Sequence, residues 1–201
     1  SHSGAGSGGA TSTGGSGPGE VPVGTNPGGV TIMCDKGAAP GVSPLMKLST
    51  LQYKHTVTDL LTSVGAAAVL PSVDGLMAAI PDDSLADGFR GRDNRTALEH
   101  VQGYFNVGRA VGDAVAKDPA LLSAVAGACV TEATLSAACV NGFLDRFVRL
   151  AYRRPLSDAD RAEYAALNDG VRTPAPAIRA LIVVALSSPR FVHQVEVDGT
   201  Q

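Results

Sequence analysis

The sequence is poor in aromatic and in charged residues, and it has no tryptophan. Lys and Arg number 16 against 19 Asp and Glu, a formal net charge of -3. The chain therefore lacks the cationic excess that neutralises a phosphate backbone, and we expect no nucleic-acid partner. Its longest apolar runs, GAAAVL and ALIVVAL, are far shorter than the roughly 20 residues that a membrane-spanning helix needs. We expect no transmembrane segment.

Cysteine is scarce, and the spacings that bind zinc or attach haem are missing. The three cysteines are Cys34, Cys129 and Cys139, and no CxxC or CxxCH motif occurs. A zinc knuckle and a covalent haem site are therefore excluded, and we expect no metal and no cofactor. No charged segment followed by an apolar one opens the chain, so a signal peptide is absent or already removed.

Glycine and serine dominate the N-terminal part. The first 30 residues hold 11 of the 24 glycines, and up to Gly19 they include no charged and no large apolar residue. Such a segment cannot bury enough surface to offset its ordering entropy. We predict a flexible tether over residues 1–40, in which His2 is idle. The remainder, 41–201, is predicted to be a helical domain, either undivided or split into small subdomains at 41–95 and 96–201.

Cys129 and Cys139 lie ten residues apart around the turn-like segment VTEATLSA. A disulfide could close this loop in an oxidising compartment, and two buried thiols in a cytosolic chain are the alternative. A Gly/Ser tether is typical of an exported, surface-anchored protein, which favours the bridge. Cys34 is expected to stay unpaired or to pair with a cysteine outside this chain.

Helical patterns begin at KLSTLQYKHTVTDLLTSVG. Ser49 with Gln52 fits a capping box, which predicts a helix that Gly65 ends. The stretch 71–95 mixes turn residues with short apolar pieces, so we expect a long surface loop with one helical turn around 76–80.

A second possible capping box, Thr96 with Glu99, predicts a helix that continues to about residue 117. Its interior contains Gly103, Gly108 and Gly112, each of which costs up to ~1 kcal/mol relative to alanine. We expect the close approach of a neighbouring helix to offset this cost.

Three further helices are predicted up to about residue 167. Asp118 with Pro119 begins a short one. The segment TLSAACVNGFLDRFVRLAYRRP predicts the next, which ends before Pro155 and carries Asp145 and Arg149 as an i,i+4 ion pair. Ser157 with Asp160 then caps a helix to about Leu167.

The last predicted helix, APAIRALIVVALSS, is opened by Thr173 and Pro174 and is apolar nearly all round, so we expect it at the buried centre. After Ser188 and Pro189 we expect a short helix or an extended tail. No segment shows sustained period-two alternation, so the predicted fold is all-α, a bundle of about six helices.

The histidines are weak candidates for chemistry. His55 and Asp59 share a helix face at a spacing seen in metal sites, but without a third ligand a local hydrogen bond or an exposed pair is favoured. His100 is expected on the surface, and His193 is expected to pack rather than to catalyse. No Gly-x-Ser-x-Gly elbow places a serine nucleophile, so we assign no catalytic residue.

Acidic and glycosylation motifs are equally weak. Asp82, Asp83 and Asp87 could hold a calcium ion, although they lack EF-hand spacing and a solvated turn is favoured. Asn94 meets the glycosylation pattern without further support.

The charges of YRRPLSDADRAEY are explained by helix ends. Arg153 and Arg154 stand at a C-terminal helix end, and Asp158 and Asp160 stand in a first turn, where each sign is favoured. The alternative is an arginine pair that binds a carboxylated or sulfated ligand.

Four motifs, taken in order, are similar to a known family: LMKLSTLQYKHTVTDLLTSVG, IPDDSLADGF, AACVNGFLDRFVRLAYRRPLSDADRAEY and LIVVALSSPRFVHQVE. They resemble the N-terminal modules of the planctomycete cytochrome C domain-containing proteins of planctomycetes and myxobacteria. The resemblance covers residues 43–197 and is most specific from Phe143 to Arg161. It implies an exported or lipid-anchored protein in which further modules follow, and it supports the Cys129–Cys139 bridge. The haem motif of some members is not present in this chain.

We therefore predict a non-catalytic helical structural or binding module, the N-terminal part of a larger exported multidomain protein. Its expected partner is the remainder of the same protein or a second processed chain. Its expected location is the periplasm, the cell surface or the medium. The alternative is one half of an extracellular enzyme, redox or hydrolytic, that acts on a biopolymer and needs its missing part.

Overall fold

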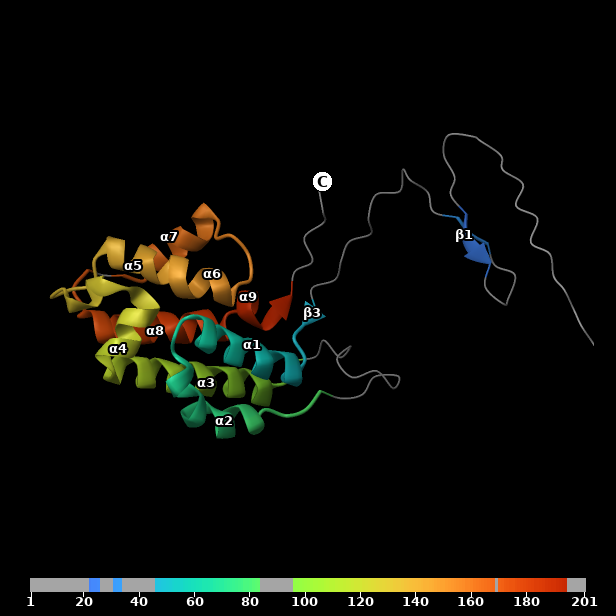
Figure 1. Ribbon diagram of the computed structural model, residues 1–201, viewed down its shortest axis with the longest axis horizontal. Coiled ribbons are helices and arrows are strands. Elements are labelled where there is room, and N and C mark those ends of the chain that lie inside the picture. Colours follow the sequence, from blue (N-terminus) through green and yellow to red (C-terminus); the bar gives the residue numbers. More distant parts are fainter. Residues whose placement is uncertain (1–21, 26–30, 34–45, 84–95, 169, 195–201) are drawn as a thin grey trace, which may run out of the picture. The chain divides into compact units, whose positions relative to one another are not determined.

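The computed structural model describes residues 22–25, 31–33, 46–83, 96–168 and 170–194 (Figure 1). The chain divides into two compact units, residues 1–42 and residues 43–201. In the first unit, β1 (Pro22–Thr25) pairs with β2 (Thr31–Met33) in antiparallel register. The rest of the predicted tether lies outside the described residues, as does Cys34.

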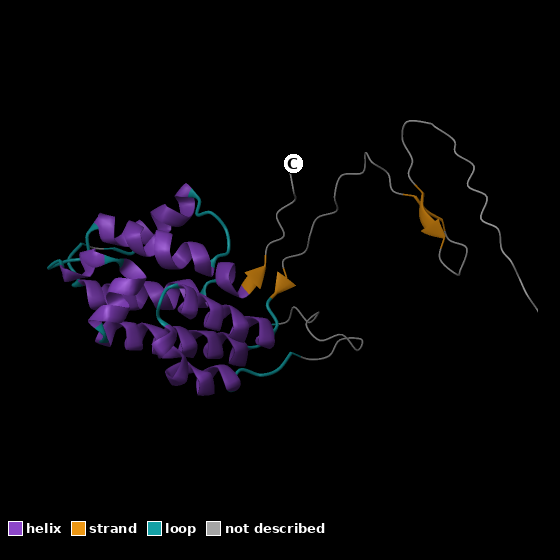
Figure 2. Cartoon of the chain, viewed as in Figure 1, coloured by secondary structure: helices purple, strands orange, loops and turns teal. Residues whose placement is uncertain are grey.

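The second unit is built from helices, which confirms the predicted all-α class (Figure 2). Its described α-helices are α1 (Thr50–Ser63), α2 (Leu70–Ala78), α3 (Leu98–Lys117), α4 (Pro119–Ala126), α5 (Ala137–Phe143), α6 (Arg149–Ala151), α7 (Asp158–Ala166), α8 (Pro174–Ser187) and α9 (Pro189–Val192). A two-residue antiparallel pair, β3 (Met46–Lys47) with β4 (His193–Gln194), joins the beginning of this unit to its end.

Several helix boundaries follow the capping signals of the sequence. At the start of α1, the Ser49 side chain accepts from the Gln52 N–H, and the Gln52 side chain accepts from the Ser49 N–H. Gly65, at φ +75°, follows the end of this helix. The Asp118 carboxylate accepts from the first turn of α4, and Ser157 with Asp160 forms the predicted capping box of α7. These local predictions are confirmed because each needs only the chain on either side of it.

The expected loop over 71–95 is wrong at its beginning. Residues 70–78 form α2, in which Pro71 stands in the first turn, where its missing N–H costs nothing. Val73, Met77 and Ile80 are buried, and α2 packs on α3. The prediction gave too much weight to the turn-forming residues of this segment. The helical spacing of its buried apolar residues is the signal that agrees with the structure. Residues 84–95 lie outside the described part.

The expected capping box of α3 is also wrong. The N-cap is Ala97, and no side chain caps this helix, which begins two residues after Thr96. The length and the C-terminal end of the helix agree with the prediction.

The predicted helix before Pro155 contains a π-helical turn, Leu144–Val148, between α5 and α6. This turn changes the i,i+4 spacing, and the predicted Asp145–Arg149 ion pair is wrong. Asp145 instead accepts from Arg161 of α7 at 2.7 Å, and the Arg149 Nε donates to the backbone oxygen of Asp145. A disulfide joins Cys129 to Cys139 and ties the start of α5 to the segment after α4.

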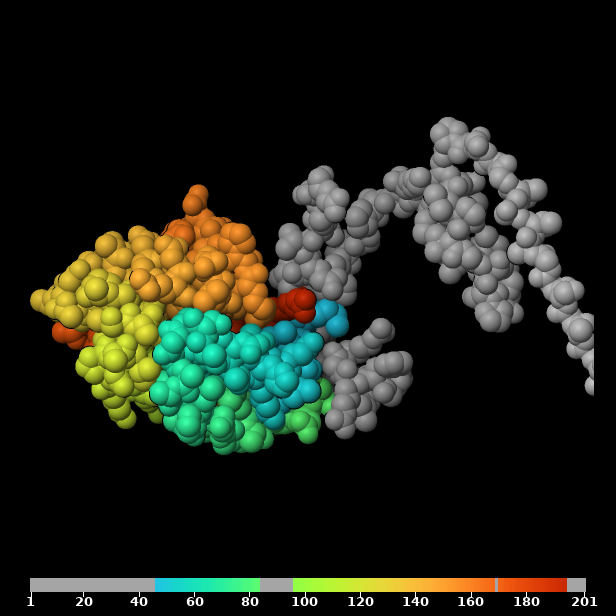
Figure 3. All heavy atoms as spheres, viewed as in Figure 1, coloured from blue at the N-terminus to red at the C-terminus, as the bar shows by residue number. Residues whose placement is uncertain are grey.

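The centre of the helical unit is the antiparallel pair α3 and α8, which lie side by side (Figure 1). A Cβ atom added to Gly112 would lie 2.9 Å from the backbone oxygen of Arg179, and one added to Gly108 would lie 3.5 Å from the Cα of Val183. The helix backbones therefore approach closely at the glycines, as the sequence predicts. In the space-filling view, the coloured atoms of the helical unit pack against one another over the face shown (Figure 3).

Candidate binding surface

The helix α8 has a buried side and a partly uncovered side. Ile178, Ile182 and Ala185 point into the core, whereas Ala180, Val183 and Val184 are only half-buried. The apolar character of α8 nearly all round predicted a place at the buried centre, and the side that faces the core is buried as expected. The other side is a strip of small apolar residues that no described element covers fully.

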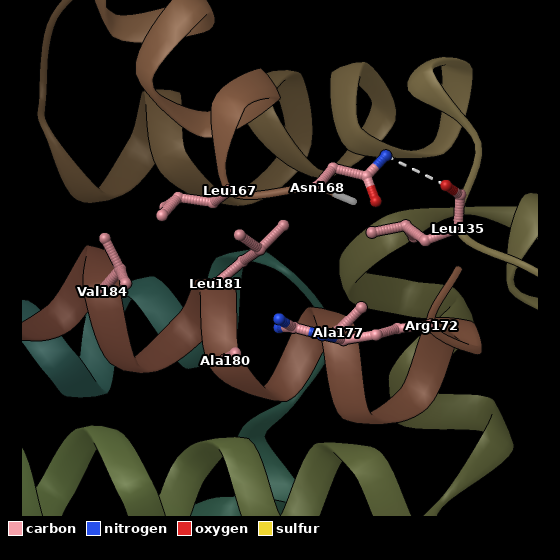
Figure 4. A pocket seen from close by; sticks show the side chains of 8 residues that line it. All are labelled: Leu135, Leu167, Asn168, Arg172, Ala177, Ala180, Leu181 and Val184. Atoms are coloured by element: carbon pink, nitrogen blue, oxygen red, sulfur yellow. Dashed lines mark hydrogen bonds between the residues drawn. The ribbon is translucent and has the colours of Figure 1, made fainter. Parts of the chain in front are cut away.

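A cavity of about 120 Å³ lies on one flank of this strip, and Figure 4 shows how its residues lie. Leu167 and Asn168, which follow α7, lie opposite Leu181 and Val184 of α8. The Asn168 side chain donates to the backbone oxygen of Leu135 at 3.0 Å, which fixes the wall at that end. The cavity is lined by Leu135, Leu167, Asn168, Arg172, Ala177, Ala180, Leu181 and Val184.

A second cavity, of about 380 Å³, lies on the other flank of α8. It is lined by Phe105, Arg109, Arg179, Ala180 and Val183. Ala180 lines both cavities, so the two depressions adjoin at this residue of α8, with Phe105 lining one and Leu167 lining the other. We call the residues that line these two cavities the α8 groove.

Exposed apolar side chains continue from the groove along α3. Leu98 is 67% exposed, Val101 50% and Phe105 44%, and their spacing places them on one face of the helix. Leu167, on the opposite wall, is 43% exposed. Single exposed apolar residues are ordinary, whereas contiguous exposed apolar residues are typical of interaction surfaces.

The charges beside the groove are mainly positive. Arg179 of α8 forms an ion pair with Asp113 of α3. In this pair the Arg179 Nε donates a hydrogen bond to the Asp113 carboxylate, and this bond lowers the pKa of the Asp113 carboxyl below its usual range. The positive charges of Arg109 and Lys117 act in the same direction. Three cations therefore surround one carboxylate, in a chain whose net charge is negative.

A charged cluster lies at YRRPLSDADRAEY, and helix-end position alone does not account for it. The Arg154 guanidinium donates to both oxygens of Asp160, at 2.8 and 3.0 Å. The Asp160 carboxylate also accepts from the Ser157 N–H and hydroxyl, and it is 1% exposed. Arg154 holds the pKa of Asp160 far below its usual range. The cluster extends to Arg190, which pairs with Asp160 and Glu163 and so ties α9 to α7.

The two arginines of this stretch are engaged within the chain. The Arg153 guanidinium donates to the backbone oxygens of Phe191 and His193, at 2.9 and 3.1 Å. Arg153 has φ 55°, a left-handed conformation that a non-glycine residue adopts only when its surroundings hold it there. These contacts argue against the alternative of an arginine pair that binds a carboxylated or sulfated ligand.

The expected surface position of His100 is wrong. His100 is 8% exposed, and within the described residues its ring nitrogens and the hydroxyls of Tyr53 and Tyr104 have no hydrogen-bond partner. The Tyr53 and Tyr104 rings pack with their centroids 4.5 Å apart, and burial raises the pKa of Tyr104 to about 12. Since α2 covers this side of α3, the error follows from the missed helix.

The acidic residues that could have held calcium are divided. Asp83 forms a buried ion pair with Lys47 at 2.7 Å and accepts a hydrogen bond from the Thr50 N–H. Burial raises the pKa of the Asp83 carboxyl, but these two contacts outweigh it and the pKa is lowered. Asp82 is exposed, and Asp87 lies outside the described residues. Asp83 therefore anchors the start of α1 to the end of α2.

His55 and Asp59 line a third cavity, of about 340 Å³, together with Arg153 and Gln194. Both side chains are exposed, so this cavity is a surface depression on α1. His193 is half-buried, and its Nδ1 lies 3.1 Å from the backbone oxygen of Pro189. Within the described residues, no three His, Cys, Asp or Glu side chains are grouped so that they could hold a metal ion. His2 and Asn94 lie outside those residues.

Comparison with known proteins identifies one segment. Residues 139–196 match PSD5, a family described as a protein of unknown function (DUF1595). The matched segment begins at the buried cysteine of the disulfide and includes α7, α8 and the Arg154–Asp160 cluster. It therefore includes the residues that line the smaller cavity, except for Leu135. Searches of curated proteins and of solved structures found no match. No helix in the described residues is long and apolar enough to span a membrane.

The groove was only partly predictable. The sequence indicated an apolar stripe on α3 and an α8 that is apolar nearly all round. Together these two signals could have predicted that some apolar side chains of these helices stay uncovered. The arginines Arg109 and Arg179 were missed, because only the pairing of α3 with α8 brings them together.

Proposed function

We propose that the helical unit is a non-catalytic binding module that packs through the α8 groove against another polypeptide. The observation that carries this proposal is the uncovered apolar strip of α8, which continues into the exposed face of α3. Burial of Phe105 and Leu167 by a partner would remove apolar surface from water, the main favourable contribution to protein association.

The lining of the groove supports binding rather than catalysis. Its polar side chains are Arg109, Arg172, Arg179 and Asn168, with no histidine, cysteine or carboxylate among the lining residues. Arginine is always protonated in proteins, so these residues can pair with anions but cannot act as general bases.

We further propose that the module belongs to a larger exported protein, and that its partner is the remainder of that protein or a second chain. The disulfide supports an oxidising compartment, since such bonds are rare in the cytosol. The PSD5 match and the resemblance of residues 43–197 to the planctomycete cytochrome C domain-containing proteins support the same setting.

The depression on α1 favours a second candidate function. His55, Asp59 and Arg153 line it, and a partner that covered it could complete the active site of an extracellular enzyme. Arg153 is already bonded to two backbone oxygens, which leaves His55 and Asp59 as the side chains available for this role.

Site-specific photo-cross-linking in the cells that make the protein separates the two functions. Benzoylphenylalanine is placed at position 105 in the α8 groove, at position 55 in the α1 depression, and at position 150 on α6 as a control with similar exposure to Phe105. We expect one defined polypeptide adduct from position 105, with little from positions 55 and 150. Adducts from position 55 alone would favour the enzyme half, and equal yields at the three positions would contradict a binding groove.

A further inference from the structure

The α8 groove also carries information on the chemistry of its occupant. We propose that the partner segment is an amphipathic helix with acidic flanks, an inference that rests on the proposed function and extends it. The argument uses the shape of the groove first and its charge second.

The shape of the groove fits a helix. Its floor residues on α8, Ala180, Val183 and Val184, are half-buried and lie on one face of this helix. Phe105 and Leu167, both partly exposed, lie at the two flanks of this face, where an occupant could contact them. An amphipathic helix inserts side chains at positions i, i+3, i+4 and i+7 into such a groove.

An extended peptide fits the groove less well than a helix. Both α3 and α8 bond their backbone groups internally along this length, so the groove offers no row of backbone donors and acceptors as a sheet edge does. An occupant must therefore satisfy its own backbone where it contacts the apolar strip, and a helix does so.

The charge of the rim selects acidic flanks. Arg109, Arg179 and Lys117 surround Asp113, so three positive charges are offset by one negative charge. Arg109 is exposed, and the structure shows no ion pair of it with a described residue. Carboxylates of an occupant would pair with the arginine forks, whereas lysines would be repelled.

The test uses the purified chain and three fluorescent, N-acetylated helical peptides of 18 residues. The peptides share leucines at positions i, i+3, i+4 and i+7 and differ only in flanking glutamate, glutamine or lysine. Binding is measured by anisotropy at low and at high salt. We expect the glutamate peptide to bind about fivefold more tightly than the glutamine peptide, the lysine peptide to bind most weakly, and salt to reduce the difference.

Matched variants separate the apolar from the charged contribution. Phe105→Glu should weaken the binding of all three peptides. Arg109→Gln should remove the preference for the glutamate peptide without removing binding. Leu150→Glu, at an exposed apolar site on α6, should change neither the affinity nor the preference. Circular dichroism checks that each variant is folded.

The outcomes distinguish this inference from the proposed function. Equal binding of the three peptides, lost in Phe105→Glu, would overturn the acidic partner and leave the binding module standing. No binding of any peptide, although position 105 cross-links to a polypeptide in cells, would overturn the acidic helix alone. Absence of both peptide binding and cross-linking would overturn both. Binding of anionic phospholipid vesicles at the same site in preference to the peptides would also overturn the acidic helix.

Discussion

Replacing Gly112 with alanine tests whether the close approach of α3 and α8 organises the helical unit. An added Cβ would lie 2.9 Å from the backbone oxygen of Arg179 and 3.2 Å from its Cγ. The first of these contacts involves a backbone atom, which cannot move without its helix. The two helices must therefore separate, and the resulting loss of packing extends along their whole interface.

Two effects of opposite sign act in this variant. Alanine gains about 0.8–1 kcal/mol over glycine in a helix interior, whereas overpacking a core contact costs about 1–3 kcal/mol. We expect a net loss of up to about 2 kcal/mol in the free energy of unfolding of Gly112→Ala. Gly75→Ala is the matched control, because nothing lies within 4 Å of its Cβ position in α2. This control should gain up to about 1 kcal/mol.

Urea denaturation followed by circular dichroism at 222 nm measures both variants. The two substitutions add the same methyl group to a helical glycine, so the difference between them reports the interhelical contact. If Gly112→Ala were as stable as Gly75→Ala, the backbone of α8 would not lie against Gly112, and the arrangement on which the α8 groove depends would be refuted.

Three further predictions concern buried contacts. Reduction of the Cys129–Cys139 disulfide should lower the free energy of unfolding by about 3 kcal/mol, measured in urea with and without reductant; no change would contradict a constraining bridge. Tyr53→Phe should leave the stability unchanged or raise it, because the buried hydroxyl has no hydrogen-bond partner in the described residues. Tyr164→Phe should lower the free energy of unfolding by about 1–2 kcal/mol, because it breaks the 2.9 Å hydrogen bond between the Tyr164 and Tyr152 hydroxyls. Equal shifts in the melting temperature of the two variants would contradict this. The folded-state pKa of Asp160 is lowered, so its contribution is complete above about pH 4, the unfolded value, and is lost as the pH falls below it. Asp160→Asn should flatten acid unfolding in that range, and an unchanged pH profile would argue against the cluster.

The sequence predicted what depends on local chemistry. Ser49 with Gln52, and Ser157 with Asp160, marked helix starts correctly because a cap involves only four consecutive residues. The glycines of α3 indicated a close neighbour because an uncompensated cost of ~1 kcal/mol each needs a tertiary reason. Neither signal identified α8 as that neighbour, which only the folded arrangement shows.

The two errors in burial share one physical origin. The interval 71–95 was interpreted from its turn residues, although Pro71 is compatible with a first helical turn and Gly75 is tolerated inside α2. Because α2 was missed, the burial of His100 beneath it was missed as well. The Arg154–Asp160 cluster was interpreted from helix ends, since pairwise contacts across a turn leave no periodic pattern in the sequence.

The candidate site was the least predictable part, because it lies across segments that are distant in the chain. Phe105, Val183 and Leu167 come from three different helical segments, and each alone is an ordinary apolar residue. What distinguishes them is that none of the three is fully buried and that all three line the α8 groove, which is a property of the packed structure.

The measurement that tests the central claim most directly is the cross-link yield at position 105 relative to position 150 in the cells that make the protein. Phe105 and Leu150 are both partly exposed, at 44% and 37%, but only Phe105 lines the α8 groove. A binding module predicts a single polypeptide adduct at position 105 that disappears in Ala180→Glu and is weak at position 150. Equal yields at both positions, or an adduct that persists in Ala180→Glu, would contradict the account.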